Sequence, residues 1–266
     1  MRSKFFKKLY LFFIFLFILT FSLALNQFLF QHEKDDKEKK HNELYDRELN
    51  KLDSMNELAE YLDKTAVLNG VKVDTGEYVN LARNIIAQRF YHGYASYGMR
   101  NNWVAFLAGT FIWNDFFGIV IPDDILKYNG ALCSQQTMVF GELLKIKGYE
   151  IRKVMLNGHF CNEVFYNNSW HFYDPDMEPV FPKDIQRPSI KDLIANKDLL
   201  HKVYKNKLDE VSINRIFSKH EEGDIDVFPA KKMAFFHYGT KVLSDWLWVL
   251  FLCLAVYFRK KASIIS

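Results

Sequence analysis

The chain has 266 residues, of which 49% are hydrophobic, so it can bury one good core and still supply apolar segments for a membrane. Its formal net charge is only +3, with both signs mixed along the chain, and this argues against a nucleic-acid surface. Three cysteines, Cys133, Cys161 and Cys253, are too few for a disulfide framework.

The first 30 residues predict a signal anchor. Basic residues precede the stretch from Leu9 to Phe30, which is apolar apart from four polar positions and is long enough to span a bilayer. A cleaved signal peptide is the alternative, because Ser22-Leu23-Ala24 is a passable cleavage site, but the apolar run is longer than an ordinary signal-peptide core. We therefore expect residues 1–30 to be a retained transmembrane helix, followed at 31–41 by a charged, solvated linker.

Residues 42–230 predict one α+β domain. Two helical patterns of apolar residues open it, from Asn42 to Leu62 and from Gly76 to Phe90. The stretch from Tyr91 to Phe117 is rich in aromatic residues. Such residues can line a substrate groove, although they more often belong to a core or an interface.

The core of this domain, residues 118–182, contains a helix with a cysteine at its start. Apolar residues recur at helical spacing between Ser134 and Lys147, and Gly148 then suits a left-handed helix cap. Cys133 therefore begins the helix, where unpaired backbone N–H groups and the helix dipole favour the nucleophilic thiolate. A lone cysteine is most often a small buried hydrophobe, so Cys133 needs partners to suggest more than that.

Two turn signals predict three antiparallel strands after this helix. Asn157-Gly158 separates an apolar, β-prone run from Ile151 to Leu156 from a second run, His159 to Tyr166. A turn at Asn167-Asn168 then leads into Trp170 to Asp174, and the following proline stops the strand.

The register of the second hairpin brings a histidine and a carboxylate together. A two-residue turn at Asn167-Asn168 places Asp174 opposite Cys161, with His159 as its diagonal neighbour about 7 to 8 Å away by Cα. A slip of one residue would put the two on opposite faces. In this arrangement Cys133 would attack an acyl carbonyl, His159 would carry the thiol proton to the leaving group, and Asp174 would hold the imidazole in one tautomer.

These residues resemble the core of the transglutaminase-like superfamily, whose members place a cysteine at a helix start, a histidine at a strand start and an Asp before Pro on the next strand. The pattern maps onto Cys133, His159 and Asp174, and the resemblance covers about a fifth to a quarter of the chain. One departure is that Gly130 precedes the cysteine by three residues, where the family usually has glycine two residues before it. The resemblance implies a papain/transglutaminase-like core.

The remaining site assignments concern the oxyanion, a metal and a disulfide. The oxyanion would use the Cys133 backbone N–H and a second donor. We expect no cofactor and no metal, because no C-x-x-C pair or histidine cluster occurs and His159 with Cys161 makes a poor metal pair. Cys161 is either a packing residue or the partner of Cys133 in a reversible disulfide. The candidates for the second oxyanion donor are Gln135, Trp103 and Trp113.

The C-terminal tail predicts a second membrane helix at 242–258. The basic run Arg259-Lys260-Lys261 follows it, and Trp246 sits where interfacial aromatic residues belong. A buried hydrophobic helix is the alternative. Because both terminal flanks are basic, the positive-inside rule places both ends in the cytosol and the intervening domain outside the plasma or inner membrane.

The sequence as a whole favours a membrane-anchored cysteine hydrolase that cleaves a peptide or another amide through a thioester acyl-enzyme. Hydrolysis is favoured over transfer, because nothing suggests the additional domains or metal sites of cross-linking transglutaminases. One alternative is a catalytically silent transglutaminase-like module that binds a partner in a membrane or envelope complex. Another is an acyltransferase similar to arylamine N-acetyltransferases, against which an extracytoplasmic position without acyl-CoA argues. The substrate and the oligomeric state are left open.

Overall fold

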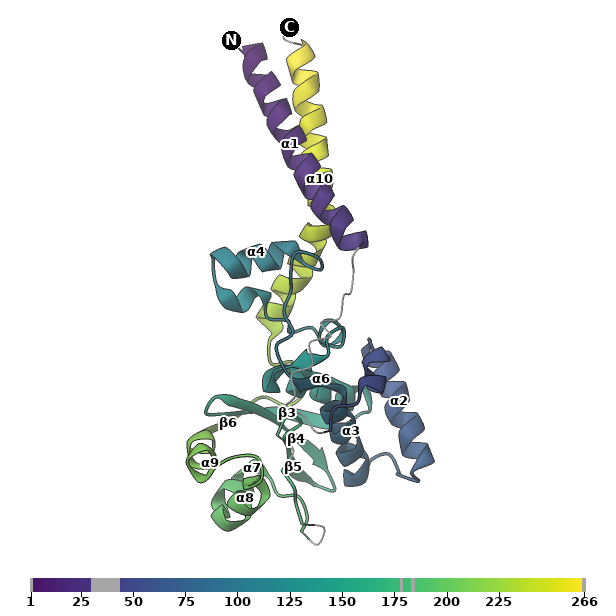
Figure 1. The fold of residues 1–266 in the computed structure, drawn as a ribbon, viewed down its shortest axis with the longest axis vertical. Coiled ribbons are helices and arrows are strands. Elements are labelled where there is room, and N and C mark those ends of the chain that lie inside the picture. The colour runs from purple at the N-terminus through teal and green to yellow at the C-terminus, as the bar shows by residue number, and fades with distance from the viewer. Residues whose placement is uncertain (1, 30–43, 178, 183–184, 265–266) are drawn as a thin grey trace. The chain divides into compact units, whose positions relative to one another are not determined.

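The structure is a computed structural model that describes residues 2–29, 44–177, 179–182 and 185–264 (Figure 1). It has an α+β fold, with an antiparallel four-stranded sheet and helices, as expected. Contacts divide the chain into two compact units. The terminal unit contains Met1–Glu33, Ser96–Ile119 and Lys232–Ser266, and the sheet unit contains Lys34–Ala95 and Val120–Lys231.

The sheet unit contains most of the secondary structure. Its helices are η1 (Arg47–Lys51), α2 (Met55–Leu68), α3 (Gly76–Arg89), α5 (Pro122–Ile125), α6 (Cys133–Ile146), α7 (Ile190–Ala195), α8 (Lys197–Tyr204) and α9 (Glu210–Ile216). Its strands are β1 (Tyr91–His92), β2 (Gly130–Ala131), β3 (Glu150–Leu156), β4 (His159–Tyr166), β5 (Ser169–Tyr173) and β6 (His220–Glu222).

The first helical pattern of the sequence is divided in the structure. Where one helix over 42–62 was predicted, η1 ends at Lys51 and α2 begins at Met55. The break has a local cause, because Ser54 and Glu57 form a capping box: the Glu57 N–H donates to Ser54 Oγ and the Ser54 N–H to Glu57 Oε2. Residues 42 and 43, with which the prediction began, lie outside the described residues.

The sheet has the strand order β5-β4-β3-β6, and neighbouring strands are antiparallel. Tyr166 pairs with Ser169, so the turn between β4 and β5 has two residues, Asn167 and Asn168, with φ of 50° and 59°. Positive φ at both positions is typical of a type I′ turn. The pairing of Asn162 with Tyr173 continues this register and confirms the predicted alignment of the two strands.

Helices cover both faces of this sheet. On one face α6 packs through Thr137, whose hydroxyl donates to the Phe160 carbonyl at 2.9 Å, and through Phe140, whose ring lies 5.7 Å from that of Tyr173. Side chains alternate along a strand, so Cys161 and Phe172 point to the other face. There they form a hydrophobic core with α7, α8 and α9. The buried residues contributed by those helices are Ile190, Leu193, Leu199, Leu200, Val203, Tyr204, Ile213 and Ile216.

A second, two-stranded sheet leads directly to the predicted cysteine. Tyr91 in β1 pairs in parallel with Gly130 in β2, and His92 pairs with Ala131. A Cβ on Gly130 would lie 2.5 Å from the Tyr91 ring, so the close pairing of these strands requires glycine at this position. The glycine three residues before Cys133 therefore allows the approach of the strand that carries His92.

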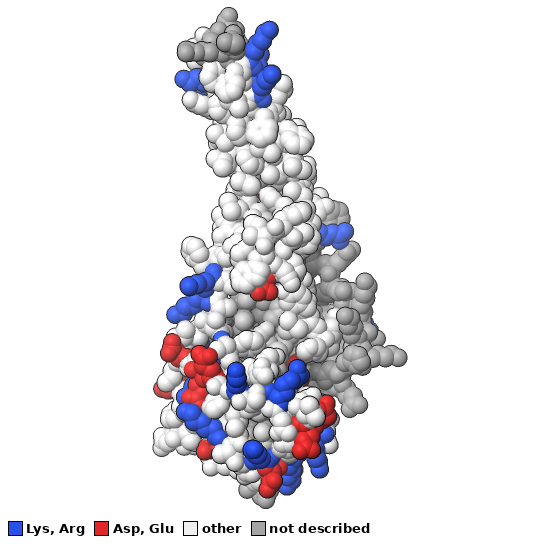
Figure 2. All heavy atoms as spheres, turned by 90° about the vertical axis from the view of Figure 1, so that its left-hand side faces the viewer, with Lys and Arg blue, Asp and Glu red and all other residues white. Residues whose placement is uncertain are grey.

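The terminal unit contains α1 (Arg2–Leu29), α4 (Trp103–Phe111), η2 (Asn114–Phe117) and α10 (Lys231–Ile264). By length and composition, α1 and α10 are each able to cross a membrane. They pack antiparallel: Phe13 stacks on Phe258 with ring centroids 5.3 Å apart, and the Gln27 side-chain amide donates to Asp245 at 2.6 Å. Figure 2 shows that their paired stem carries Lys and Arg at the end where both termini lie and few charged residues along its length.

The two units correspond to the predicted segments except at residues 96–119. The expected membrane helices, 1–30 and 242–258, correspond to α1 and to the middle of α10. The segment Ser96–Ile119, which lies inside the predicted 42–230 domain, groups with these helices and not with the sheet. The predicted linker, 31–41, lies outside the described residues.

Candidate active site

Cys133 is the first residue of α6, as the sequence predicted, and its side chain is partly exposed. The first turn is closed by the N–H groups of Gln135 and Gln136, which both donate to the Leu132 carbonyl at 2.9 Å. The Gln135 side chain accepts from the Leu132 N–H at 3.1 Å and so fixes the residue before the cysteine. The helix start thus holds the sulfur in a defined place at the positive end of the helix dipole.

His159 begins β4 and lies against a buried carboxylate. Its Nε2–H donates to Asp174 Oδ2 at 2.9 Å, and both side chains are almost completely buried. The bond fixes the ring and leaves Nδ1 as the nitrogen that can serve a neighbouring thiol. Burial alone lowers the pKa of His159, but the charge of Asp174, the two neighbouring cysteines and the hydrogen bond raise it well above its ordinary value.

Asp174 is held by more than the histidine. The Tyr204 hydroxyl donates to its Oδ2 at 2.8 Å, and the backbone N–H groups of Asp176 and Met177 donate to its Oδ1 at 3.2 and 3.0 Å. Burial raises the pKa of Asp174, but His159 and these hydrogen bonds outweigh it and lower the pKa below its usual value. The carboxylate is therefore ionised and fixed next to the imidazole.

The structure brings the cysteine and the histidine together. Cys133 Sγ, a ring nitrogen of His159 and a carboxylate oxygen of Asp176 all lie within 4.8 Å of one another. The same imidazole is bonded to Asp174 through Nε2, so His159 links the cysteine to the buried carboxylate. The three residues predicted from the sequence thus meet in one cluster around His159.

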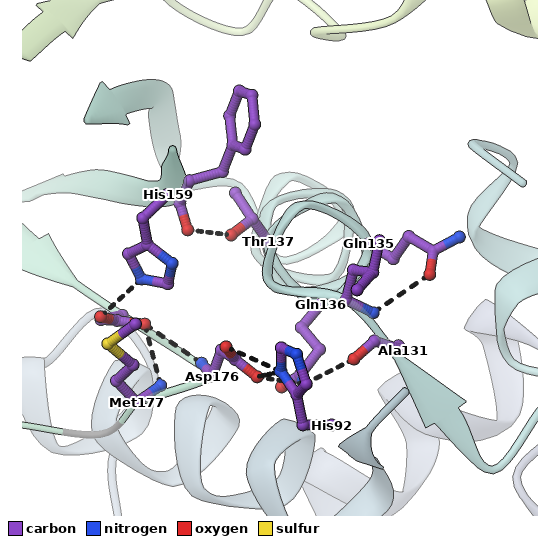
Figure 3. A network of polar contacts seen from close by, with 11 residues as sticks. His92, Ala131, Gln135, Gln136, Thr137, His159, Asp176 and Met177 are labelled. Carbon is purple, nitrogen blue, oxygen red and sulfur yellow. Dashed lines mark hydrogen bonds and ion pairs between the residues drawn. The ribbon is translucent and has the colours of Figure 1, made fainter. Parts of the chain in front are cut away.

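A second pair of polar residues at this site was missed by the sequence reasoning. Asp176 accepts from the Gln136 side-chain amide at 2.8 Å and from His92 Nδ1 at 3.0 Å (Figure 3). The hydrogen bond that His92 donates to Asp176 raises the pKa of His92, against the opposing effects of partial burial and of His159. The available signals were the second acidic residue of Asp174-Pro175-Asp176 and the histidine at the start of the aromatic stretch.

Two of the three candidate oxyanion donors have other partners in the structure. The Gln135 side chain exchanges hydrogen bonds with the backbone of Ala95, with its Nε2 donating to the carbonyl at 2.7 Å, so it positions a loop. Trp103 and Trp113 belong to the terminal unit, and the Trp103 indole N–H donates to the Ser244 carbonyl there. Of these three, neither Gln135 nor Trp103 offers an uncommitted side-chain donor of the expected kind.

Cys161 is a free, fully buried thiol in the core between the sheet and α7 to α9. Burial is the main cause that raises its pKa, so the neutral thiol is favoured. This is the packing role that was one of its two expected readings. The fully buried set of His159, Cys161 and Asp174 also has metal-ligating atoms within 4.8 Å of one another, as has the more open set of Cys133, His159 and Asp176. Thiol, imidazole and carboxylate groups suit zinc, so a chelator control belongs in any assay of this site.

Comparison with protein-family models, with curated proteins and with solved structures finds no match to this chain. The transglutaminase-like resemblance therefore rests on the order and spacing of the sequence motifs alone.

Proposed function

We propose that the chain is a membrane-anchored, transglutaminase-like cysteine hydrolase that cleaves a peptide or another amide. One observation carries the proposal: a partly exposed sulfur at a helix start lies within 4.8 Å of a ring nitrogen of His159, whose Nε2 is bonded to the buried, ionised Asp174. A cysteine that served only for packing would be buried and would not need an oriented imidazole beside it, whereas Cys133 is partly exposed and has one.

The reaction would proceed in two steps. Cys133 Sγ attacks the amide carbonyl while His159 Nδ1 takes the thiol proton, and the imidazolium then protonates the leaving nitrogen as the C–N bond breaks. Water attacks the resulting thioester, gives its proton to His159 and releases the acid and the thiol. Asp174 holds the ring and stabilises its charge throughout, and the Cys133 backbone N–H is the nearest oxyanion donor at the helix start.

The surroundings of the sulfur favour an amide over an anionic acyl carrier. Asp176 places a carboxylate beside Cys133 and His159. A carboxylate accepts hydrogen bonds from substrate N–H groups and repels phosphates, which argues against acyl-CoA as the donor.

The terminal helices support a tethered enzyme. The contacts of α1 with α10, among them Phe13 with Phe258 and Gln27 with Asp245, favour α1 as a retained anchor over a cleaved signal peptide. Basic residues lie at the N-terminal end of α1 and at the C-terminal end of α10. By the positive-inside rule, both termini are therefore cytosolic and the sheet unit is extracytoplasmic.

A generic acyl donor tests the proposal without knowledge of the substrate. With p-nitrophenyl acetate, the detergent-solubilised full chain should release a burst of one p-nitrophenol per protein and carry an acetyl thioester on Cys133, found by peptide mass spectrometry. Cys133→Ser and His159→Ala should abolish the burst, whereas Cys161→Ala should retain it, and a chelator should not change it. Absence of acylation from the folded protein favours the silent module, and acylation by acetyl-CoA favours the acyltransferase.

A further inference from the structure

The segment between the two parts of the sheet unit forms a helical hairpin in the terminal unit. The Asn102 side chain caps α4 by accepting from the Ala105 N–H at 3.1 Å, and η2 returns after Phe111. The two arms are in tight contact, because a Cβ on Gly109 would lie 2.1 Å from the Phe117 ring. We call residues 103–117, which comprise α4, η2 and their connection, the aromatic hairpin.

Specific polar contacts attach this hairpin to α10. The Asn102 side-chain amide donates to Thr240 Oγ1 at 2.9 Å, and the Ser244 hydroxyl donates back to Asn102 Oδ1 at 3.0 Å. The Trp103 indole N–H and the Val104 N–H donate to the Ser244 carbonyl and hydroxyl, each at 3.1 Å. Because these groups are largely buried, the network fixes the hairpin rigidly on the helix.

The second arm of the hairpin contacts the same helix one turn earlier. His237 Nε2–H donates to the Phe116 carbonyl at 3.0 Å, and the Phe116 ring stacks on Phe236 with centroids 4.6 Å apart. Positions 237, 240 and 244 recur at the spacing of one helix face. That face of α10 is therefore devoted to the hairpin.

The attachment lies at one end of the membrane-crossing stem. Asp245, which pairs with Gln27 near the end of α1, directly follows Ser244 in α10. The aromatic residues Trp246 and Trp248 come next and are of the type that gathers at membrane interfaces. The hairpin is thus joined to α10 within about one helical turn of the level at which both helices leave the apolar zone.

The tip of the hairpin exposes three large apolar side chains in succession. Phe111, Ile112 and Trp113 are 80%, 77% and 55% exposed. Nearby on α10, outside the face that holds the hairpin, Phe235 and Tyr238 are also exposed. A water-soluble surface seldom presents consecutive large apolar residues without a partner.

We propose that the aromatic hairpin inserts its tip, Phe111 to Trp113, into the interfacial layer of the bilayer that α1 and α10 cross. The rigid attachment to α10 at the end of the stem places the tip at headgroup level, and its aromatic and aliphatic side chains suit the boundary between headgroups and acyl chains. The chain enters the hairpin from Ala95 and leaves it to Val120, so the sheet unit gains an additional attachment to the membrane surface. The proposal does not depend on the chemistry of Cys133.

Site-directed spin labelling of the full chain in phosphatidylcholine/phosphatidylglycerol nanodiscs tests this inference. The label goes on Ile112→Cys in a background of Cys133→Ala and Cys253→Ala, since Cys161 is fully buried. Matched reference labels go on Val211→Cys, a 77% exposed site of the sheet unit, and on Leu250→Cys, an exposed site of the α10 span.

The measured quantity is the accessibility of each spin label to oxygen, which is enriched in lipid, divided by its accessibility to a water-soluble nickel chelate. The oxygen-to-nickel ratio at position 112 should be several-fold above that at 211 and should approach that at 250. A ratio at 112 equal to that at 211 would overturn the proposal. The proposal would also be overturned if the label at position 112 were accessible to water in nanodiscs and immobilised only in native membranes. That result would mean that the tip binds a protein partner and not the lipid. Far-ultraviolet circular dichroism of each labelled protein confirms that it is folded.

Discussion

Replacing Tyr204 by phenylalanine removes one hydroxyl, which donates to Asp174 Oδ2 at 2.8 Å. Both side chains are fully buried, so water cannot supply the lost donor. Since the pKa of Asp174 is lowered in the folded protein, the acceptor is a charged carboxylate at neutral pH. A hydrogen bond to a charged group contributes about 1.5 to 3 kcal/mol to stability, whereas one between neutral groups contributes about 0.5 to 1.5 kcal/mol.

Tyr166→Phe is the matched control, because its hydroxyl is bonded at 2.9 Å to the neutral Tyr173 hydroxyl. Each kcal/mol shifts the melting temperature of a unit of this size by about 2 to 4 °C, so Tyr204→Phe should lower Tm by about 3 to 12 °C and Tyr166→Phe by about 1 to 6 °C. Differential scanning fluorimetry of the detergent-solubilised full chain at pH 7 measures both shifts. If Tyr166→Phe costs as much as Tyr204→Phe, the argument that Asp174 is a buried, hydrogen-bonded carboxylate is refuted.

Further substitutions at three residues test other parts of the account. The raised pKa of His159 depends largely on Asp174, so the stability that this ion pair contributes is complete below about pH 6.5 and is lost only as pH rises through the folded pKa of His159. Asp174→Asn should therefore destabilise the protein most at pH 6 and slow the alkylation of Cys133 at that pH. An unchanged alkylation rate at pH 6 would contradict this. Cys161→Ala should change the alkylation rate of Cys133, as measured by mass spectrometry, much less than His159→Ala does, because the buried thiol contributes less to the raised pKa of His159 than Asp174 does. Glu163→Ala should cost about 1.5 to 3 kcal/mol in thermal unfolding, because it removes the carboxylate that accepts from the Ile190 N–H and from Arg152, which keeps Glu222 as a partner. Glu163→Gln should cost clearly less, since it keeps an acceptor; equal losses would argue against a structural role of the buried carboxylate.

The central part of the site could be predicted because local signals specify it. Helical periodicity and Gly148 defined where α6 begins and ends, and so placed Cys133 at its start. The turn residues Asn167 and Asn168, with φ values that few other residues adopt, fixed the register that puts His159 near Asp174. These features depend on neighbouring residues and not on the rest of the fold.

The parts that could not be predicted depend on contacts distant in sequence. His92 reaches the site through a pairing of β1 with β2 only two residues long, which no periodicity reveals. The aromatic stretch was considered as a groove, but Trp103 and its neighbours pack on α10, where the polar residues Thr240 and Ser244 were the overlooked signal. Gln135 is adjacent to the cysteine in sequence, yet the approach of Ala95 commits its side chain to a loop.

The pairing of Cys133 with His159 is tested most directly by the rate at which iodoacetamide alkylates Cys133 near pH 6, followed by mass spectrometry of the intact, folded chain. If the imidazole activates the sulfur, Cys133 should react about tenfold or more faster than glutathione at this pH, and His159→Ala should abolish the advantage. A rate no faster than that of glutathione, or one that His159→Ala does not change, would contradict the account.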